Sequence, residues 1–221
     1  MNNIELSASM MCADFSCLRD EVKKLEKAGI DVFHIDIMDG SFVDNFGMGY
    51  QDMAYIKNNS SKKAEVHLMV KQPYNYLNIL FKLKIDIIYI HPEVDTDPAT
   101  TIEKIQQQGA VAGIAINPGT SVSTIEELLN IVDSVLVLGV NPGHSGRQYQ
   151  PYVDNKIKKL LLLREKYNFT IALDGAVTKE RLLFWHKKGV SKFVLGTATL
   201  FNKDSNKSYN AIIRNIKQDI K

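Results

Sequence analysis

The sequence contains little cysteine, no long apolar run and no strong excess of one charge. Its 221 residues include only Cys12 and Cys17, which are too few for a disulfide framework and lack the second pair that a zinc knuckle requires. No apolar stretch approaches the roughly 20 residues that span a bilayer, and the N-terminus lacks the basic segment and apolar core of a signal peptide. These absences predict a cytoplasmic protein with two reduced thiols and no membrane partner.

Charge and length exclude further classes. Lys and Arg number 27 and Asp and Glu number 25, a formal charge of +2, and the lysines are spread between apolar residues instead of forming a basic block. Nucleic acid is therefore not an expected partner, while a homo-oligomer stays open. The length and the 45% hydrophobic content suit one domain over residues 1–221 with a sizeable core.

Short apolar strands alternate with amphipathic helices eight times along the chain. The predicted strands are Ile4–Met11, Val32–Met38, Ala64–Val70, Asp86–Ile90, Val111–Asn117, Ser134–Val140, Thr170–Leu173 and Lys192–Gly196. Helical spacing of apolar residues predicts a first helix through Leu18, Val22 and Leu25 that ends near Gly29. Further stripes predict helices that contain Ile125, Leu128, Leu129 and Val132, then Leu160–Leu163, and finally Tyr209, Ile212, Ile213, Ile216 and Ile220.

Strands joined by helices are parallel, and eight such units most often close into a (β/α)8 barrel. We therefore predict an α/β fold, a single-domain (β/α)8 TIM barrel, with an open doubly wound sheet as the alternative. In such a barrel the functional groups lie at the carboxyl ends of the strands. Metal-capable side chains fall there, because His34 and Asp36 are on the second strand, His67 is on the third and Asp174 follows the seventh.

The second strand carries the clearest chemical signal. Alternation places His34, Asp36 and Met38 on one face and Phe33, Ile35 and Ile37 on the other. An imidazole and a carboxylate without partners in a core cost several kcal/mol, and a divalent cation would satisfy both. Any one of these polar residues alone is more simply a satisfied core residue, whereas four on three strand ends favour a metal site.

These residues also carry a resemblance to a known family. The sequence resembles the ribulose-phosphate 3-epimerase family at Ser9-Met10-Met11-Cys12-Ala13-Asp14-Phe15, His34-Ile35-Asp36-Ile37-Met38-Asp39-Gly40, His67-Leu68-Met69-Val70, Asn117-Pro118, Asn141-Pro142-Gly143 and Leu173-Asp174-Gly175. The resemblance runs in order through nearly the whole chain. It implies a TIM barrel that binds one divalent metal ion and epimerises C3 of a ketose phosphate.

The resemblance also implies roles for individual residues. The metal ligands would be His34, Asp36, His67 and Asp174, and the acid and base would be Asp36 and Asp174. Ser9 and His67 would contact the substrate. Two histidines and two carboxylates suit Zn²⁺, Fe²⁺, Mn²⁺ or Co²⁺, and Met38 and Met69 would supply a dry wall or simply fill the core.

The loops expected to bind phosphate depart from the family pattern. The usual Gly-Phe-Gly-Gly-Gln is Gly143-His144-Ser145-Gly146-Arg147, the usual Asp-Gly-Gly is Asp174-Gly175-Ala176, and a common methionine on the sixth strand is Leu138. Main-chain N–H groups after the last three strands would hold the phosphate. The expected substrate-binding residues there are Gly143, His144, Ser145, Gly146, Arg147, Gly175, Ala176, Gly196 and Thr197.

The departures concern the substrate more than the reaction. We expect conversion of D-ribulose 5-phosphate to D-xylulose 5-phosphate by two aspartates through a metal-stabilised enediolate. His91-Pro92-Glu93 and Gly196-Thr197 resemble the branch that acts on D-allulose 6-phosphate, which is the alternative substrate. A metal-binding barrel that has lost catalysis is a third reading. The hexulose-phosphate synthase type is disfavoured, because Asp36-Ile37-Met38-Asp39 lacks the lysine of its Asp-x-Lys-x-x-Asp motif.

Overall fold

The computed structural model describes residues 4–220 and contains the eight predicted strands. The strands are β1 (Glu5–Ser9), β2 (Val32–Met38), β3 (Lys63–Met69), β4 (Ile87–Ile90), β5 (Val111–Ile116), β6 (Ser134–Leu138), β7 (Thr170–Asp174) and β8 (Lys192–Leu195). Every strand begins and ends within two residues of its predicted bounds. Short apolar runs between helical segments therefore located the whole sheet.

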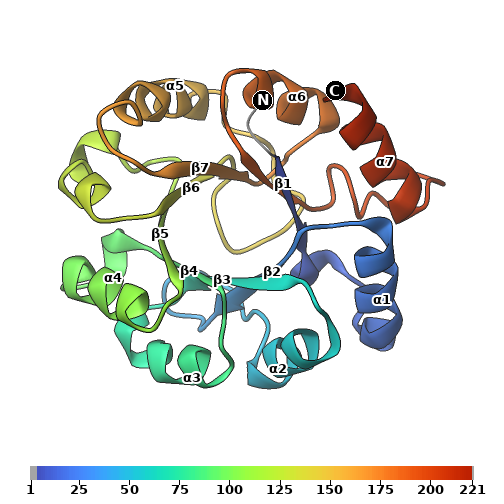
Figure 1. Ribbon diagram of the computed structural model, residues 1–221, viewed down its shortest axis with the longest axis horizontal. Helices are drawn as coiled ribbons and strands as arrows, with labels where there is room; N and C mark the ends of the chain where they lie inside the picture. Colours follow the sequence, from blue (N-terminus) through green and yellow to red (C-terminus); the bar gives the residue numbers. More distant parts are fainter. Residues whose placement is uncertain (1–3, 221) are drawn as a thin grey trace.

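The sheet is a closed ring of parallel strands. Each strand pairs with its neighbours in chain order, and β8 pairs with β1 through Leu6 opposite Phe193. The (β/α)8 barrel is confirmed, and the open doubly wound sheet is wrong. Figure 1 shows the helices arranged around the ring, so that the outward strand faces are covered.

Seven α-helices surround the barrel within residues 4–220. They are α1 (Leu18–Ala28), α2 (Tyr50–Asn59), α3 (Leu77–Lys82), α4 (Pro98–Gln107), α5 (Val153–Leu163), α6 (Lys179–Lys187) and α7 (Tyr209–Asp219). The predicted first helix ends where expected, because Gly29 adopts φ +86° and its N–H bonds back to the last turn. No helix within residues 4–220 combines the length and the apolar character that crossing a membrane requires.

The helix predicted around Ile125–Val132 is wrong. The chain there forms only two short 3₁₀ turns, Val122–Thr124 and Glu127–Asn130. Ser121 and Thr124 use their hydroxyls on the local backbone, since the Ser121 Oγ accepts from Ser123 N–H and the Thr124 Oγ1 donates to Ser121 O at 2.7 Å. Such bonds compete with helix formation. The apolar stripe is still used, because Ile125 and Leu129 are buried.

The two faces of the strands build different cores. Phe33, Ile35 and Ile37 pack in the large apolar core between barrel and helices, as predicted. Inside the barrel, an apolar cluster fills the β4 to β8 side and includes Tyr89 and Leu136. The interior side chains of β1 to β3 are instead largely polar and buried: Ser7, Ser9, His34, Asp36, Glu65 and His67. The barrel thus contains one polar wall, and Asp174 faces it from β7.

Candidate metal centre and active site

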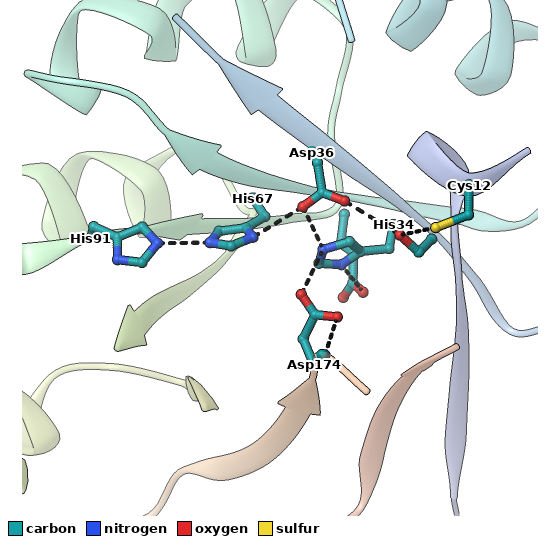
Figure 2. Close-up of polar contacts among 9 residues, drawn as sticks. Cys12, His34, Asp36, His67, His91 and Asp174 are labelled. Carbon is teal, nitrogen blue, oxygen red and sulfur yellow. Dashed lines mark hydrogen bonds and ion pairs between the residues drawn. The ribbon is translucent and has the colours of Figure 1, made fainter. Parts of the chain in front are cut away.

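Four side chains from three strands converge at the carboxyl end of the barrel. His34 and Asp36 come from β2, His67 from β3 and Asp174 from the last position of β7. One potential ligand atom of each lies within 4.8 Å of the others. Figure 2 shows the four side chains pointing toward one another. The register of β2 and β3, which pairs Asp36 with His67, places the two strands' ligands side by side.

The hydrogen bonds of His34 leave one nitrogen free for a cation. Its Nδ1 lies 2.8 Å from Oε1 of the buried Glu65, so the carboxylate accepts and Nδ1 carries the proton. Its Nε2 is buried and finds no hydrogen-bond partner among the described residues. That nitrogen lies 3.3 Å from Asp36 Oδ1 and 3.9 Å from Asp174 Oδ2. An unpaired imidazole nitrogen facing two carboxylates is the arrangement that a divalent cation fits.

Charge and burial separate the proton affinities of the two aspartates. Burial raises the pKa of each carboxyl, because it disfavours the charged form. At Asp36 the neighbouring His34 and His67 outweigh burial and lower the pKa. At Asp174 burial prevails, the negative charge of Asp36 acts in the same direction, and the pKa is raised. Two carboxyls with divergent acidities in one site suit acid and base catalysis.

Proton binding by His34 competes with metal binding at the cluster. Burial lowers the pKa of His34, but Asp36 and Glu65 outweigh it and raise the pKa well above its usual value. A metal ligand must be unprotonated, so a cation at this site competes with that proton. The donor set of imidazoles and carboxylates suits Zn²⁺, Fe²⁺, Mn²⁺ or Co²⁺ and does not select one of them.

A cavity of about 350 Å³ opens above the cluster. Asp36, His67 and Asp174 form part of its floor, while His34 lies fully buried below. All of the residues expected to bind substrate line this cavity: Ser9, His67, Gly143, His144, Ser145, Gly146, Arg147, Gly175, Ala176, Gly196 and Thr197. Met69 also lines it, and Met38 and Met69 form a small apolar cluster with Val43.

The loop after β6 reaches across the cavity mouth. Gly143 and Gly146 adopt φ +105° and +81°, backbone conformations that glycine allows. The loop meets the β2 loop twice, since Asn45 Nδ2 donates to Gly143 O at 2.6 Å and His144 Nε2 lies 3.2 Å from Asp44 Oδ1. Arg147 is exposed at the rim of the cavity. The loop therefore lines the cavity with two glycines and with the side chains of His144 and Arg147.

Sequence reasoning assigned no site role to several polar residues that the structure places at or beside the cluster. Glu65 carried a usable signal, because it lies two positions before His67 and shares its strand face. Cys12 lines the cavity from the 3₁₀ turn Met10–Cys12, and Asn202 lines it from the segment after β8. Glu93 reaches the fully buried His91, whose Nδ1 lies 3.2 Å from Glu93 Oε2. Burial lowers the pKa of His91 to about 4.

Fold and site together define a (β/α)8 barrel with a candidate metal centre beneath a polar cavity. Comparison with known proteins is more specific. Residues 5–200 match the Ribulose-phosphate 3 epimerase family. A protein of Methanocaldococcus jannaschii named ribulose-phosphate 3-epimerase is 37% identical over 207 residues, which are 93% of this chain and 87% of that protein. A Bacillus subtilis protein of the same name is 34% identical over 95% of this chain and 98% of its own length.

The chain belongs to the ribulose-phosphate 3-epimerase family. It is thus an epimerase of the isomerase class, and its substrate is a phosphorylated ketose. Among solved structures, 3-hexulose-6-phosphate synthase from Salmonella typhimurium aligns over 98% of both chains with a TM-score of 0.75 and 14% identity. That likeness concerns the fold alone.

Proposed function

We propose that this protein interconverts D-ribulose 5-phosphate and D-xylulose 5-phosphate by inverting C3. The observation that carries the proposal is the meeting of Asp36 and Asp174, from strands β2 and β7, at one cluster on the floor of the cavity. Relatives named ribulose-phosphate 3-epimerase support the five-carbon sugar. The site lies within one proposed domain over residues 1–221.

Inversion next to a ketone needs proton removal on one face and proton delivery on the other. Asp36 and Asp174 perform these two transfers at C3 and exchange roles when the reaction reverses. Ser9 Oγ lies 3.4 Å from Asp36 Oδ2 and orients that carboxylate. The Gly175 N–H donates to Asp174 Oδ1 at 2.7 Å and leaves Oδ2 toward the cluster.

One divalent cation held by His34, Asp36, His67 and Asp174 would supply positive charge beside the ketose oxygens. The buried apolar side chains of Met38 and Met69 exclude water from the reacting carbon. The phosphate lies against the turns after β6, β7 and β8, which line the cavity through Gly143, Gly146, Gly175 and Gly196. Arg147, at the rim, adds a guanidinium suited to a phosphate.

D-Allulose 6-phosphate is the second candidate substrate. His91-Pro92-Glu93 and Gly196-Thr197 resemble the branch that acts on this six-carbon sugar, and Thr197 lines the cavity. The same two proton transfers would convert it to D-fructose 6-phosphate. The rest of the proposed mechanism is unchanged.

A substrate panel tests the proposal. Protein loaded separately with Zn²⁺, Mn²⁺, Fe²⁺ or Co²⁺ is assayed with ribulose 5-phosphate, xylulose 5-phosphate, allulose 6-phosphate and fructose 6-phosphate, with unphosphorylated ribulose as the control. We expect the highest kcat/KM with the two pentose phosphates. A higher kcat/KM with the hexose phosphates would identify D-allulose 6-phosphate as the substrate instead. No turnover of any sugar phosphate by metal-loaded protein would overturn the proposal and indicate a barrel that has lost catalysis.

A further inference from the structure

A series of side-chain contacts connects His67, through the buried His91, to the partly buried carboxylate of Glu93 outside the metal cluster. His67 Nε2 lies 2.8 Å from His91 Nε2, and His91 Nδ1 lies 3.2 Å from Glu93 Oε2. On the other side of the ring, His67 Nδ1 lies 3.1 Å from Asp36 Oδ1. Figure 2 shows Asp36, His67 and His91 in one line. Both imidazole nitrogens of His67 are therefore engaged, one toward the cluster and one away from it.

The number of available protons limits how the three contacts among Asp36, His67, His91 and Glu93 can be hydrogen-bonded. A neutral imidazole carries one N–H, so His67 and His91 together supply two protons for three contacts. One contact must hold no proton and would place two lone pairs against each other. A cation between Asp36 and His67 Nδ1 removes that conflict, because it binds both lone pairs. The two protons then fill the contacts from His67 to His91 and from His91 to Glu93.

The hydrogen bonds of Glu93 determine which of the three contacts contains no proton. Its Oε1 accepts from the Asn117 N–H at 3.1 Å and from the Thr120 hydroxyl, which leaves Oε2 to accept from His91. The Glu93 side chain is 21% exposed. Burial raises the pKa of Glu93, but the hydrogen bonds from His91, Thr120 and Asn117 outweigh it and hold the pKa at about 2. An ionised carboxylate only accepts, so His91 must present its proton on Nδ1.

Neighbouring residues fix the position of the His91 ring, which lies between His67 and Glu93. His91 is fully buried, and its ring packs against Phe42 with 4.7 Å between ring centroids. A buried ring favours its neutral form. With Nδ1–H directed to Glu93, the Nε2 of His91 is an acceptor and takes the Nε2–H of His67. The lone pair of His67 is then on Nδ1, which faces the cluster.

We propose that Glu93 and His91 are positioning residues that fix the tautomer of His67, so that its unprotonated Nδ1 faces the divalent cation. This inference rests on the metal centre of the proposed function and is independent of which sugar is the substrate. Metal-binding histidines commonly depend on such outer partners, whose loss weakens metal binding by about 10- to 100-fold.

Glu93→Gln is the informative substitution because it keeps the shape and reverses the hydrogen bonding. The Gln oxygen would keep accepting from Asn117 and Thr120, so its NH₂ group would donate to His91 Nδ1. His91 must then donate from Nε2, His67 must accept there, and the His67 proton moves to Nδ1. We expect Zn²⁺ to bind about 10- to 100-fold more weakly, measured by competition with a chelator. Thr120→Val is the matched control, since it removes another donor to Glu93 without reversing this series of contacts, and its Zn²⁺ affinity should stay close to wild type.

Nitrogen-15 NMR of the histidine rings gives a readout that a merely structural role would not move. In Zn²⁺-loaded wild-type protein we expect His67 to carry Nε2–H with Nδ1 on the metal, and His91 to carry Nδ1–H. The opposite tautomer at either ring in this protein overturns the inference even if the variant does not fold. A folded Glu93→Gln protein that binds Zn²⁺ like wild type also overturns it. Failure of wild type to bind any of the four cations would instead remove the proposed metal centre itself.

Discussion

Asp36 and Asp174 differ in burial, hydrogen bonding and strand, and this difference makes their roles separable. If each serves one face of C3, either Asn substitution should reduce epimerisation by about 100- to 10,000-fold. Each variant should still exchange the C3 hydrogen of one epimer with deuterated solvent, and the two variants should act on opposite epimers. NMR of recovered substrate in D₂O measures this exchange.

The control for both variants is metal content, because both carboxylates are proposed ligands as well as bases. Rates are compared only between proteins that hold equal amounts of metal. A metal-replete Asp36→Asn or Asp174→Asn protein that epimerises at the wild-type rate would show that the substituted aspartate is not an essential base.

Some site residues can be predicted from the sequence, and others cannot, for physical reasons. His34, Asp36 and His67 follow from strand alternation, and Asp174 from its place at a strand end. Glu93 could not be found in this way. Its partners Asn117 and Thr120 lie 24 and 27 residues later, and only the side-by-side packing of successive barrel units brings them together.

Strands β4 and β5 approach each other closely at Gly113 of β5. A Cβ atom at this position would collide with the ring of the fully buried Tyr89 on β4. Tyr89 cannot easily move aside, because its hydroxyl lies 3.0 Å from Ser134 Oγ. Gly113→Ala should therefore lower the free energy of unfolding by about 1–3 kcal/mol. Denaturant titration measures the change.

Gly119→Ala is the matched control for this strand substitution. Among the described residues, no atom beyond the two chain neighbours of Gly119 lies within 4 Å of the position that a Cβ would take there. The stability of Gly119→Ala should therefore stay within about 0.5 kcal/mol of wild type. Equal stability of both variants and wild type would mean that the β4–β5 contact is looser than described.

Helix α5 contributes a buried lysine whose charge should make stability depend on pH. The Lys156 ammonium donates to the carbonyls of Asn117 and Pro118, and burial lowers its pKa from 10.5 to about 8 despite the nearby Glu93. Between pH 8 and 10.5 the unfolded chain binds more protons at this residue than the folded chain does. The contribution of Lys156 to stability should therefore rise with pH across that window, by on the order of 2 kcal/mol.

Lys156→Met provides the reference for this measurement, because other groups also titrate at alkaline pH. The free energy of unfolding of both proteins is measured by denaturant titration from pH 7.5 to 10.5. Wild type should gain stability relative to the Met variant as pH rises. A constant difference would show that Lys156 keeps its ordinary acidity in the fold.

Elements were predictable to the extent that their apolar period was unambiguous. The strands were located within two residues, and α1, α5 and α7 formed where their stripes predicted helices. The segment after β5 has a helical stripe but forms 3₁₀ turns. There, serine and threonine hydroxyls bond to the local backbone, a competition that an apolar stripe does not report.

Within residues 4–220 each strand pairs with its two neighbours in the barrel, and the candidate metal centre adds a connection between strands that do not pair. Ligands from β2, β3 and β7 meet at one point. Closure could be predicted from the count of eight units, whereas the division of the barrel interior into a polar β1 to β3 side and an apolar β4 to β8 side became visible only in the fold.

This connection predicts that a bound cation stabilises the whole barrel. A cation that binds only the folded chain adds about 2.7 kcal/mol when its free concentration is 100 times its Kd. For a chain of this size, such a gain raises Tm by about 5–11 °C. Calorimetry of chelator-treated protein with and without added Zn²⁺ or Mn²⁺ measures the shift. Arg147→Ala, at the rim, should gain as much as wild type, while Asp174→Asn, which lacks one ligand charge, should gain less. Equal shifts in all three proteins, or no shift in wild type, would place the cation elsewhere than among His34, Asp36, His67 and Asp174.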